Sequence, residues 1–178
     1  LLADLVDSTK TKFTKTPRFA RNLIVIHNKV AVKAIVAKQG RVPKILGDAV
    51  VGLFSNNKGV DKAVECTIEI QKKVTSLNET PNNALRFKTR IAIVTGDIKW
   101  ISYEGISDFI SSAFDVLAKV IKQCEPGEII YVGNEIPSIS NDELRLRFHP
   151  WTYKLAKIKG ILGVRKIYPI NWKTASPG

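Results

Sequence analysis

Two periods of apolar residues divide the chain into expected helices and strands. The opening run LLADLV (1–6) is typical of a strand. From Pro17 to Gly40 the apolar positions follow a helical period, with proline suited to the first turn and glycine to the end. Apolar or small residues recur at spacings near three and four over 60–77, which predicts a second helix.

Strand-like segments rich in Val, Ile and Leu separate and follow these helices. The stretch RVPKILGDAVVGLF (41–54) predicts a hairpin with Gly47-Asp48 at its turn. Residues 85–103 predict a second hairpin that turns at Gly96-Asp97, and a third helix is expected from a cap at Ser107 or Asp108 to Pro126-Gly127. Further strands are expected at 128–132, 144–158 and 164–171. This order is typical of an α+β sandwich with helices packed on one sheet, and not of a doubly wound parallel fold.

Length and composition indicate one globular domain over residues 1–178. The chain has 178 residues, of which 44% are apolar, enough for a core of its own. It begins inside an apolar run, so we expect residues before Leu1. Without a run of 18 apolar residues or a signal peptide, a cytoplasmic protein is expected. We expect Cys66 and Cys124 to be buried thiols, and the two histidines to be structural.

The net charge of +12 attracts phosphate-bearing partners. Nucleic acid, anionic lipid and nucleoside triphosphates are all partners that fit this charge. The alternative is a basic surface that is solvated by water and binds no partner. The cations are spread over 10–21, 72–73 and 154–166, and neither a recognition-helix pattern nor an aromatic platform for single strands is present. A nucleic-acid partner would also leave the acidic residues described next unexplained, so we expect none.

Two carboxylates, Asp4 and Asp48, each end an apolar strand. Consecutive strands of such units commonly lie side by side, so both side chains are expected at one edge of the sheet. Two neighbouring carboxylates repel each other unless cations neutralise them, and oxygen ligands of this type suit Mg²⁺ or Mn²⁺. The alternative is that Asp7 and Ser8 cap a helix and Asp48 is only a good turn former.

Six motifs in order resemble the catalytic domain of class III nucleotidyl cyclases. They are DLVDST (4–9), KILGDAVVGLF (44–54), RIAIVTGDI (90–98), DFISSAFDVLAK (108–119), EPGEI (125–129) and KGILGVRKIY (159–168). The resemblance covers essentially the whole chain. It implies a ferredoxin-like α+β sandwich with a mostly antiparallel sheet and helices packed on it.

The resemblance also assigns roles to residues of this chain. It implies that Asp4, Asp48 and the Leu5 carbonyl hold two Mg²⁺ or Mn²⁺ ions. Amides and hydroxyls of the loop Val6, Asp7, Ser8 and Thr9 are implied to cradle the triphosphate, together with Lys159, for which a generic surface lysine is the alternative. Tyr168 lies where the family's last motif also has tyrosine.

Base selection is implied to rest on Lys44, which donates to a purine ring nitrogen, and Asp108, which accepts from the exocyclic amine of adenine. This pair favours ATP over GTP, although cytosine also carries an exocyclic amine. The alternative for Asp108 is a helix cap.

The third helix departs from the family pattern. Asp115 replaces the asparagine that orients the ribose, Lys119 replaces the arginine that grips the phosphoryl group, and Ser111 replaces a glycine. Lysine keeps the charge but loses the bidentate fork of arginine. Alternatively, Asp115 and Lys119 form an ordinary i,i+4 salt bridge.

The resemblance implies a homodimer with two equivalent sites at the interface, because this chain carries both halves of the family's site. The expected activity is a lyase reaction that converts a nucleoside triphosphate, preferably ATP, into its 3′,5′-cyclic monophosphate and pyrophosphate in signal transduction. One alternative is a pyrimidine cyclase that makes cyclic UMP or cyclic CMP in bacterial defence against phage. Another is a degenerate module that binds nucleotide and dimerises without catalysis.

Overall fold

The computed structural model describes residues 1–55, 58–81, 83–161 and 163–173. Its centre is a seven-stranded sheet in which β4 and β7 are parallel and all other neighbours are antiparallel. In spatial order the strands are β2 (Arg41–Leu46), β3 (Ala49–Leu53), β1 (Leu2–Leu5), β4 (Thr89–Val94), β7 (Ile129–Gly133), β9 (Val164–Pro169) and β8 (Lys154–Lys157). The expected α+β fold with a mostly antiparallel sheet is confirmed. Leu162 of the last motif lies outside the described residues.

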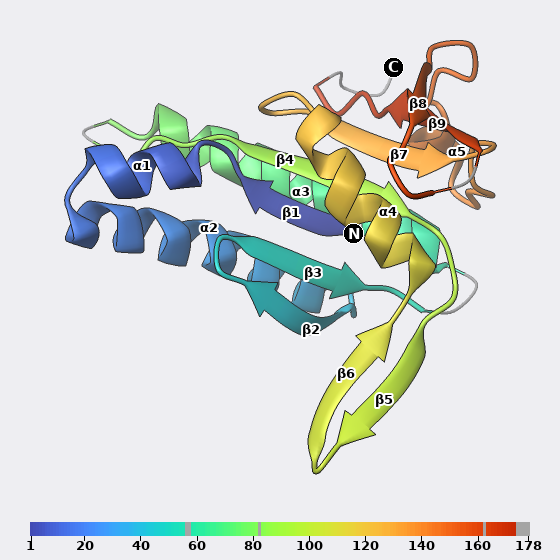
Figure 1. Ribbon diagram of the computed structural model, residues 1–178. Helices are drawn as coiled ribbons and strands as arrows, with labels where there is room; N and C mark the ends of the chain where they lie inside the picture. Colours follow the sequence, from blue (N-terminus) through green and yellow to red (C-terminus); the bar gives the residue numbers. More distant parts are fainter. Residues whose placement is uncertain (56–57, 82, 162, 174–178) are drawn as a thin grey trace.

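Helices cover both faces of this sheet (Figure 1). They are α1 (Ser8–Thr14), α2 (Pro17–Ala37), α3 (Gly59–Glu79), α4 (Ser112–Val120), continued by the 3-10 turn η1 (Ile121–Gln123), and α5 (Asp142–Arg145). Pro17 stands in the first turn of α2, and the Thr16 side chain accepts from the Phe19 amide as its cap. The two long helices predicted from periodicity are therefore confirmed.

Alternation along the strands separates two apolar cores. Leu1, Ala3 and Leu5 belong to the core beneath α2 and α3, whereas Leu2 packs in the second core with residues of α4. Since successive side chains of a strand point to opposite faces, Asp4 shares the α4 face with Leu2. Asp4 therefore lies on the face of the sheet opposite to the long helices α2 and α3.

The expected second hairpin is wrong in its pairing. Strand β5 (Lys99–Tyr103) does not return along β4 but pairs with β6 (Ile106–Ile110), and the turn lies at Glu104-Gly105. Both edges of β4 are already occupied, one by β1 and the other by β7, so β5 has no free edge there. The β5–β6 hairpin projects from the body as an arm (Figure 1).

Two other expected elements are shorter than predicted. The third helix begins at Ser112 with Ser111 as its N-cap, because the Ser111 hydroxyl accepts from the Phe114 amide, and this places Asp108 in β6. The strand expected over 144–158 is confined to β8. The Asn141 side chain accepts from the amides of Glu143 and Leu144 and so starts the short helix α5.

None of the helices in the described part of the chain has both the length and the apolar character that crossing a membrane requires. Cys66 and Cys124 are buried and free, as expected, and burial raises the pKa of each thiol to about 12.

Candidate active site

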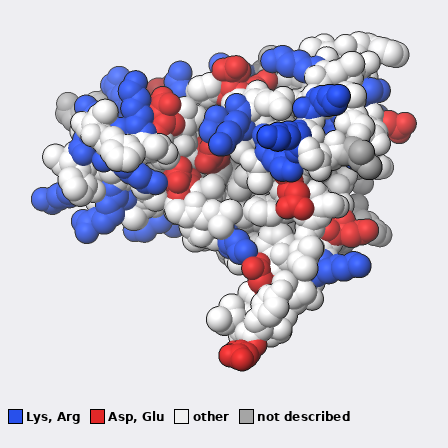
Figure 2. Space-filling model, in the orientation of Figure 1, with Lys and Arg blue, Asp and Glu red and all other residues white. Residues whose placement is uncertain are grey.

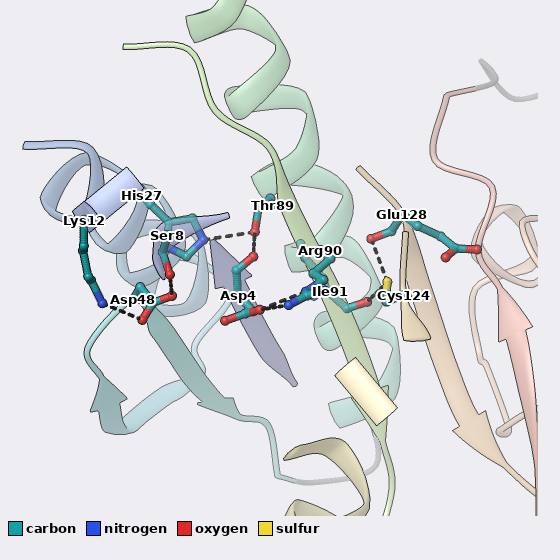
Figure 3. Close-up of polar contacts among 10 residues, drawn as sticks. All are labelled: Asp4, Ser8, Lys12, His27, Asp48, Thr89, Arg90, Ile91, Cys124 and Glu128. Atoms are coloured by element: carbon teal, nitrogen blue, oxygen red, sulfur yellow. Dashed lines mark hydrogen bonds and ion pairs between the residues drawn. The ribbon is translucent and has the colours of Figure 1, made fainter. Parts of the chain in front are cut away.

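The two predicted carboxylates extend from adjacent backbone segments. Asp4 lies opposite Ala49 in the β1–β3 pair, and the Leu5 amide donates to the Asp48 carbonyl at 3.2 Å. The Gly47-Asp48 turn is present as expected, with Gly47 at φ 67°. Figure 3 shows the Asp4 side chain on β1 beside that of Asp48 at the turn. The fold therefore brings these two positions to the same end of neighbouring strands, the edge of the sheet at which β1 ends and the β2–β3 turn lies.

Each carboxylate has a basic neighbour. Arg90 faces Asp4 across the β1–β4 pair, with its Nε 2.9 Å and its Nη2 2.8 Å from the Asp4 Oδ2. Lys12 of α1 places its Nζ 3.5 Å from the Asp48 Oδ1, and the Ser8 hydroxyl donates to the Asp48 Oδ2 (Figure 3). The side chains of Asp4 and Asp48 are 17% and 21% exposed, so both are accessible from solvent.

The donor chemistry of this edge fits a hard divalent cation. Two partly exposed carboxylates and the neighbouring Leu5 carbonyl are oxygen donors of the kind that Mg²⁺ and Mn²⁺ prefer. No group of three or more His, Cys, Asp or Glu that could form a complete protein cage occurs among the described residues. A metal held here would take its other ligands from water or from substrate phosphates, as Mg²⁺ commonly does.

The loop after β1 was expected to cradle phosphates. Asp7 adopts a left-handed conformation, with φ 56°, at the N-cap of α1 and makes no side-chain capping bond. Ser8 is buried and bonds to Asp48 instead of capping the helix. The Val6 amide donates to the Lys88 carbonyl at 3.0 Å, within the β1–β4 edge. The side chains of Asp7 and Ser8 therefore do not cap α1, so this alternative is wrong.

The two expected base-reading residues form an ion pair. The Nζ of Lys44 in β2 lies 2.7 Å from the Oδ1 and 2.9 Å from the Oδ2 of Asp108 in β6. The hydrogen bond from Lys44, followed by one from the Phe109 amide, lowers the pKa of Asp108. Asp108 is thus not a helix cap, and folding joins two residues that are far apart in the sequence.

The remaining candidates flank a separate groove. Asp115 and Lys119 of α4 line a cavity of about 850 Å³ that also includes Gly160 and Arg165, from the segment between β8 and β9 and from β9. The Lys119 Nζ donates to the Lys159 carbonyl at 2.9 Å. Lys119 therefore does not form the i,i+4 salt bridge with Asp115, and it lies next to the expected triphosphate lysine. Tyr168 is buried, with its hydroxyl donating to the Asn134 carbonyl, so its role here is structural.

Arg90 and Lys12 were not anticipated from the sequence. Arg90 lies within a quoted motif, but its role depends on the register that puts it opposite Asp4. Lys12 belongs to a segment whose Thr and Lys residues gave no helical pattern, although they form α1. Figure 2 shows Lys and Arg gathered over the α1–α2 end of the molecule, beside the Asp48 turn.

The site is divided into two parts within one chain. No hydrogen bond or ion pair among the described residues connects Asp4 or Asp48 with Asp115, Lys119 or Lys159. Asp4 lies in β1 and Asp48 at the β2–β3 turn, whereas the second group lies at α4 and the β8–β9 connection.

Comparison with solved structures identifies the fold. The guanylyl cyclase Cya2 is 17% identical with a TM-score of 0.77, over 95% of this chain and 88% of that one. The adenylyl cyclase CyaB from P. aeruginosa is 15% identical with a TM-score of 0.69, over 99% and 94%. A dimeric guanylyl cyclase domain of the RhoGC fusion protein from the aquatic fungus Blastocladiella emersonii is 8% identical with a TM-score of 0.63, over 95% and 92%.

Neither a family model nor a curated protein matches the chain. The chain has the fold of adenylyl and guanylyl cyclase catalytic domains, which confirms the family resemblance of its motifs at the level of the fold.

Proposed function

We propose that the chain is a nucleotide cyclase that converts a nucleoside triphosphate, preferably ATP, into the 3′,5′-cyclic monophosphate and pyrophosphate. The observation that carries this proposal is the adjacency of Asp4 and the Gly47-Asp48 turn, in a chain with the fold of nucleotide cyclases. In the reaction the 3′ oxygen bonds to the α-phosphorus and loses its proton. The bond from the α-phosphorus to the bridging oxygen breaks, and pyrophosphate leaves with that electron pair.

Asp4, Asp48 and the Leu5 carbonyl are the residues that would hold two Mg²⁺ or Mn²⁺ ions. When bound, such ions favour the ionised 3′-hydroxyl and neutralise charge on the triphosphate. The chain itself positions the carboxylates: Ser8 and Lys12 orient Asp48, and Arg90 orients Asp4. All three residues are held by α1 or β4, so the carboxylates are set before substrate arrives.

The triphosphate is assigned to cationic and amide groups. The loop of Val6, Asp7, Ser8 and Thr9 follows β1 directly beside the carboxylates. The Val6 amide is engaged by the Lys88 carbonyl and the Ser8 hydroxyl by Asp48, so the amides of the following residues are proposed to face the phosphates. Lys119 lines the groove and donates to the backbone carbonyl of Lys159, and the ammonium groups of both lysines are proposed to counter the charge that develops during displacement. Asp115, on the same groove, is assigned to the ribose. The basic surface over α1 and α2 attracts the anionic substrate over a longer range (Figure 2).

The Lys44–Asp108 pair supports the preference for ATP. An ammonium donor and a carboxylate acceptor side by side match the ring nitrogen and the exocyclic amine of adenine. Guanine presents a carbonyl oxygen where Asp108 requires a donor, which disfavours GTP. Cytosine shares the amine, and Asp115 and Lys119 depart from the family pattern, so a pyrimidine cyclase that makes cyclic CMP or cyclic UMP in antiphage defence is the second candidate.

The arm supports a homodimer. Its side chains include Trp100, 53% exposed, and Ile106, 72% exposed, and a two-stranded hairpin is marginally stable by itself in water. A second copy would cover these residues and would place its α4 groove against the carboxylates of the first. The dimer thereby completes two equivalent sites, in agreement with the separation of the two parts within one chain.

A non-catalytic nucleotide-binding module is the competing function. It is favoured by Asp115 and Lys119, which stand where the family pattern has asparagine and arginine. This module would bind triphosphate and dimerise, and it would release no product with any metal.

The deciding experiment incubates the purified protein with Mn²⁺ and each of the four nucleoside triphosphates and identifies products by mass. A cyclic nucleotide that disappears in Asp48→Ala and remains in Asp142→Ala supports the proposal. Asp142 is a matched control because its carboxylate is exposed in α5 and pairs with Arg145, three residues later in the same helix. Unchanged turnover in Asp48→Ala refutes the metal assignment. A thermal shift with triphosphate, without product, supports the binding module instead.

A further inference from the structure

Helix α2 carries a fully buried histidine in its apolar stripe. The buried positions of this helix are Ala20, Leu23, His27, Ala31, Ala34 and Ile35. His27 has no exposed surface, and it contacts the edge of the Phe87 ring, with 6.1 Å between ring centroids. Because burying an unpaired polar ring is costly, the hydrogen bonds of His27 decide why a histidine is tolerated there.

Those hydrogen bonds connect the backbones of the two carboxylate segments. On one side, the His27 Nε2 lies 3.0 Å from the Thr89 Oγ1, which donates to the Asp4 carbonyl at 3.1 Å (Figure 3). On the other side, the His27 Nδ1 lies 3.0 Å from the Asn28 Oδ1, and the Asn28 Nδ2 donates to the Gly47 carbonyl at 2.8 Å. The bridge therefore runs from Asp4 to the residue that precedes Asp48.

The order of donors and acceptors fixes the imidazole. The amide group of Asn28 donates to Gly47, so its oxygen faces the ring and the His27 Nδ1 must carry a proton. Burial lowers the pKa of His27, which keeps the ring neutral and leaves its Nε2 as an acceptor facing the Thr89 hydroxyl. In this tautomer the single Thr89 hydroxyl proton is shared between two acceptors, the His27 Nε2 and the Asp4 carbonyl. A leucine or methionine of similar size would provide neither the donor at Asn28 nor the acceptor at Thr89.

The turn needs such a support because it lies at the edge of the sheet. Strand β2 is the outermost strand, and the β1–β3 register ends at Asp4 and Ala49. Beyond that pair, the hydrogen bond from the Leu5 amide to the Asp48 carbonyl continues the backbone contact. The hydrogen bond from Asn28 reaches the Gly47 carbonyl from the helix layer, whereas the bond from the Leu5 amide lies within the sheet. The two bonds therefore hold the turn from two different directions.

We propose that His27 is a positioning residue that sets the spacing of Asp4 and Asp48 through Thr89 and Asn28, and thereby sets the affinity of this edge for divalent cations. This inference rests on the proposed metal role of the two carboxylates. Groups that orient metal ligands from outside the ligand set typically change metal affinity by about 10–100-fold.

The test measures Mn²⁺ binding by the electron paramagnetic resonance signal of free Mn²⁺, with no nucleotide present. His27→Leu, Thr89→Val and Asn28→Ala each interrupt the bridge at a different point. We expect each to raise the Kd for Mn²⁺ by about 10-fold, and the double variant of His27 and Asn28 to be no worse than either single variant. Asn22→Ala, earlier on the same helix, is the matched control and leaves the Kd unchanged.

Activity as a function of Mn²⁺ gives a second readout. The Mn²⁺ concentration for half-maximal activity rises in the bridge variants, whereas kcat at saturating Mn²⁺ falls by less than about 3-fold. Asn28→Ala keeps the test decisive if His27→Leu does not fold, because Asn28 is only partly buried.

The failures of the two proposals are distinguishable. Wild-type protein that binds Mn²⁺, loses it in Asp48→Asn and forms no product refutes the cyclase while the bridge is still tested by the Kd values. Bridge variants that lose stability but keep the wild-type Kd overturn the inference and make His27 a packing residue. Absence of Mn²⁺ binding to the wild-type protein also overturns it.

Discussion

Exchanging the charges of the Lys44–Asp108 pair predicts a change of substrate. In the wild type the Lys44 Nζ lies 2.7 Å from the Asp108 Oδ1. The double variant Lys44→Asp with Asp108→Lys retains an ion pair between the same strands, because the combined length of the two side chains does not change. The polarity presented to the base is inverted. The carboxylate at 44 accepts from the ring N–H of guanine, and the ammonium at 108 donates to the guanine carbonyl.

The structure sets the size of the expected effects. Both side chains are about one third exposed, 34% and 35%, so the pair contributes little to stability and the melting temperature changes by no more than about 3 °C. Selectivity between ATP and GTP depends on the contacts of residues 44 and 108 with the base. In the double variant both contacts become mismatched to adenine. A buried site rejects such a mismatch by about 10⁴-fold or more, and partial exposure reduces this to about 100-fold in the ratio of kcat/KM for GTP and ATP.

The assay compares ATP and GTP turnover in the double variant and in both single variants, with Mn²⁺ and product detection by mass. Lys44→Asp alone presents two carboxylates to the base, and Asp108→Lys alone presents two ammonium groups. Each single variant is therefore expected to lose activity with both nucleotides. The base-reading assignment is refuted if the double variant folds, remains active and keeps the wild-type preference. A preference for UTP or CTP in the wild type would instead support the pyrimidine alternative.

Three further predictions concern α4, the arm and the buried histidine. Asp115→Asn with Lys119→Arg restores the family pattern and is expected to raise kcat about 10-fold; no gain at saturating Mn²⁺ and ATP contradicts the proposed roles. Ile106→Glu is expected to give a folded, inactive monomer by light scattering after gel filtration, and an intact active dimer would exclude the arm from the interface. Because burial lowers the pKa of His27, the unfolded state binds more protons below pH 6.5, so the free energy of unfolding falls on acidification through that range. In urea titrations at pH 5–8, His27→Gln should lack this component, at most about 1.4 kcal/mol per pH unit, and identical pH profiles would contradict a neutral buried ring.

Local signals in the sequence were sufficient for the elements that carry the carboxylates. Pro17, Gly40 and the apolar period define α2, and Gly47-Asp48 between two apolar runs defines the β2–β3 turn. These features depend on residues that are close in the sequence, where backbone preference and periodicity act directly. The same reasoning failed for β5, because the Gly96-Asp97 signal says nothing about which edges of β4 are free.

Long-range register explains most of what the sequence did not provide about the candidate site. The opposition of Arg90 to Asp4 depends on the β1–β4 alignment, and the ion pair of Asp108 with Lys44 depends on where the arm leaves the body. Asp108 resembles a helix cap in sequence, yet Ser111 takes the capping position. His27 was expected to be structural, and its burial agrees with that, but its connection to both carboxylate segments requires three elements to be assembled.

The most direct test of the central claim is ³¹P nuclear magnetic resonance of the reaction with the diamagnetic ion Mg²⁺ and the preferred triphosphate. Cyclisation at Asp4 and Asp48 predicts that the cyclic monophosphate and pyrophosphate appear at equal rates, and that both signals are lost in Asp4→Asn and in Asp48→Asn. Formation of nucleoside diphosphate and orthophosphate, or equal cyclase activity in these variants, would contradict the account.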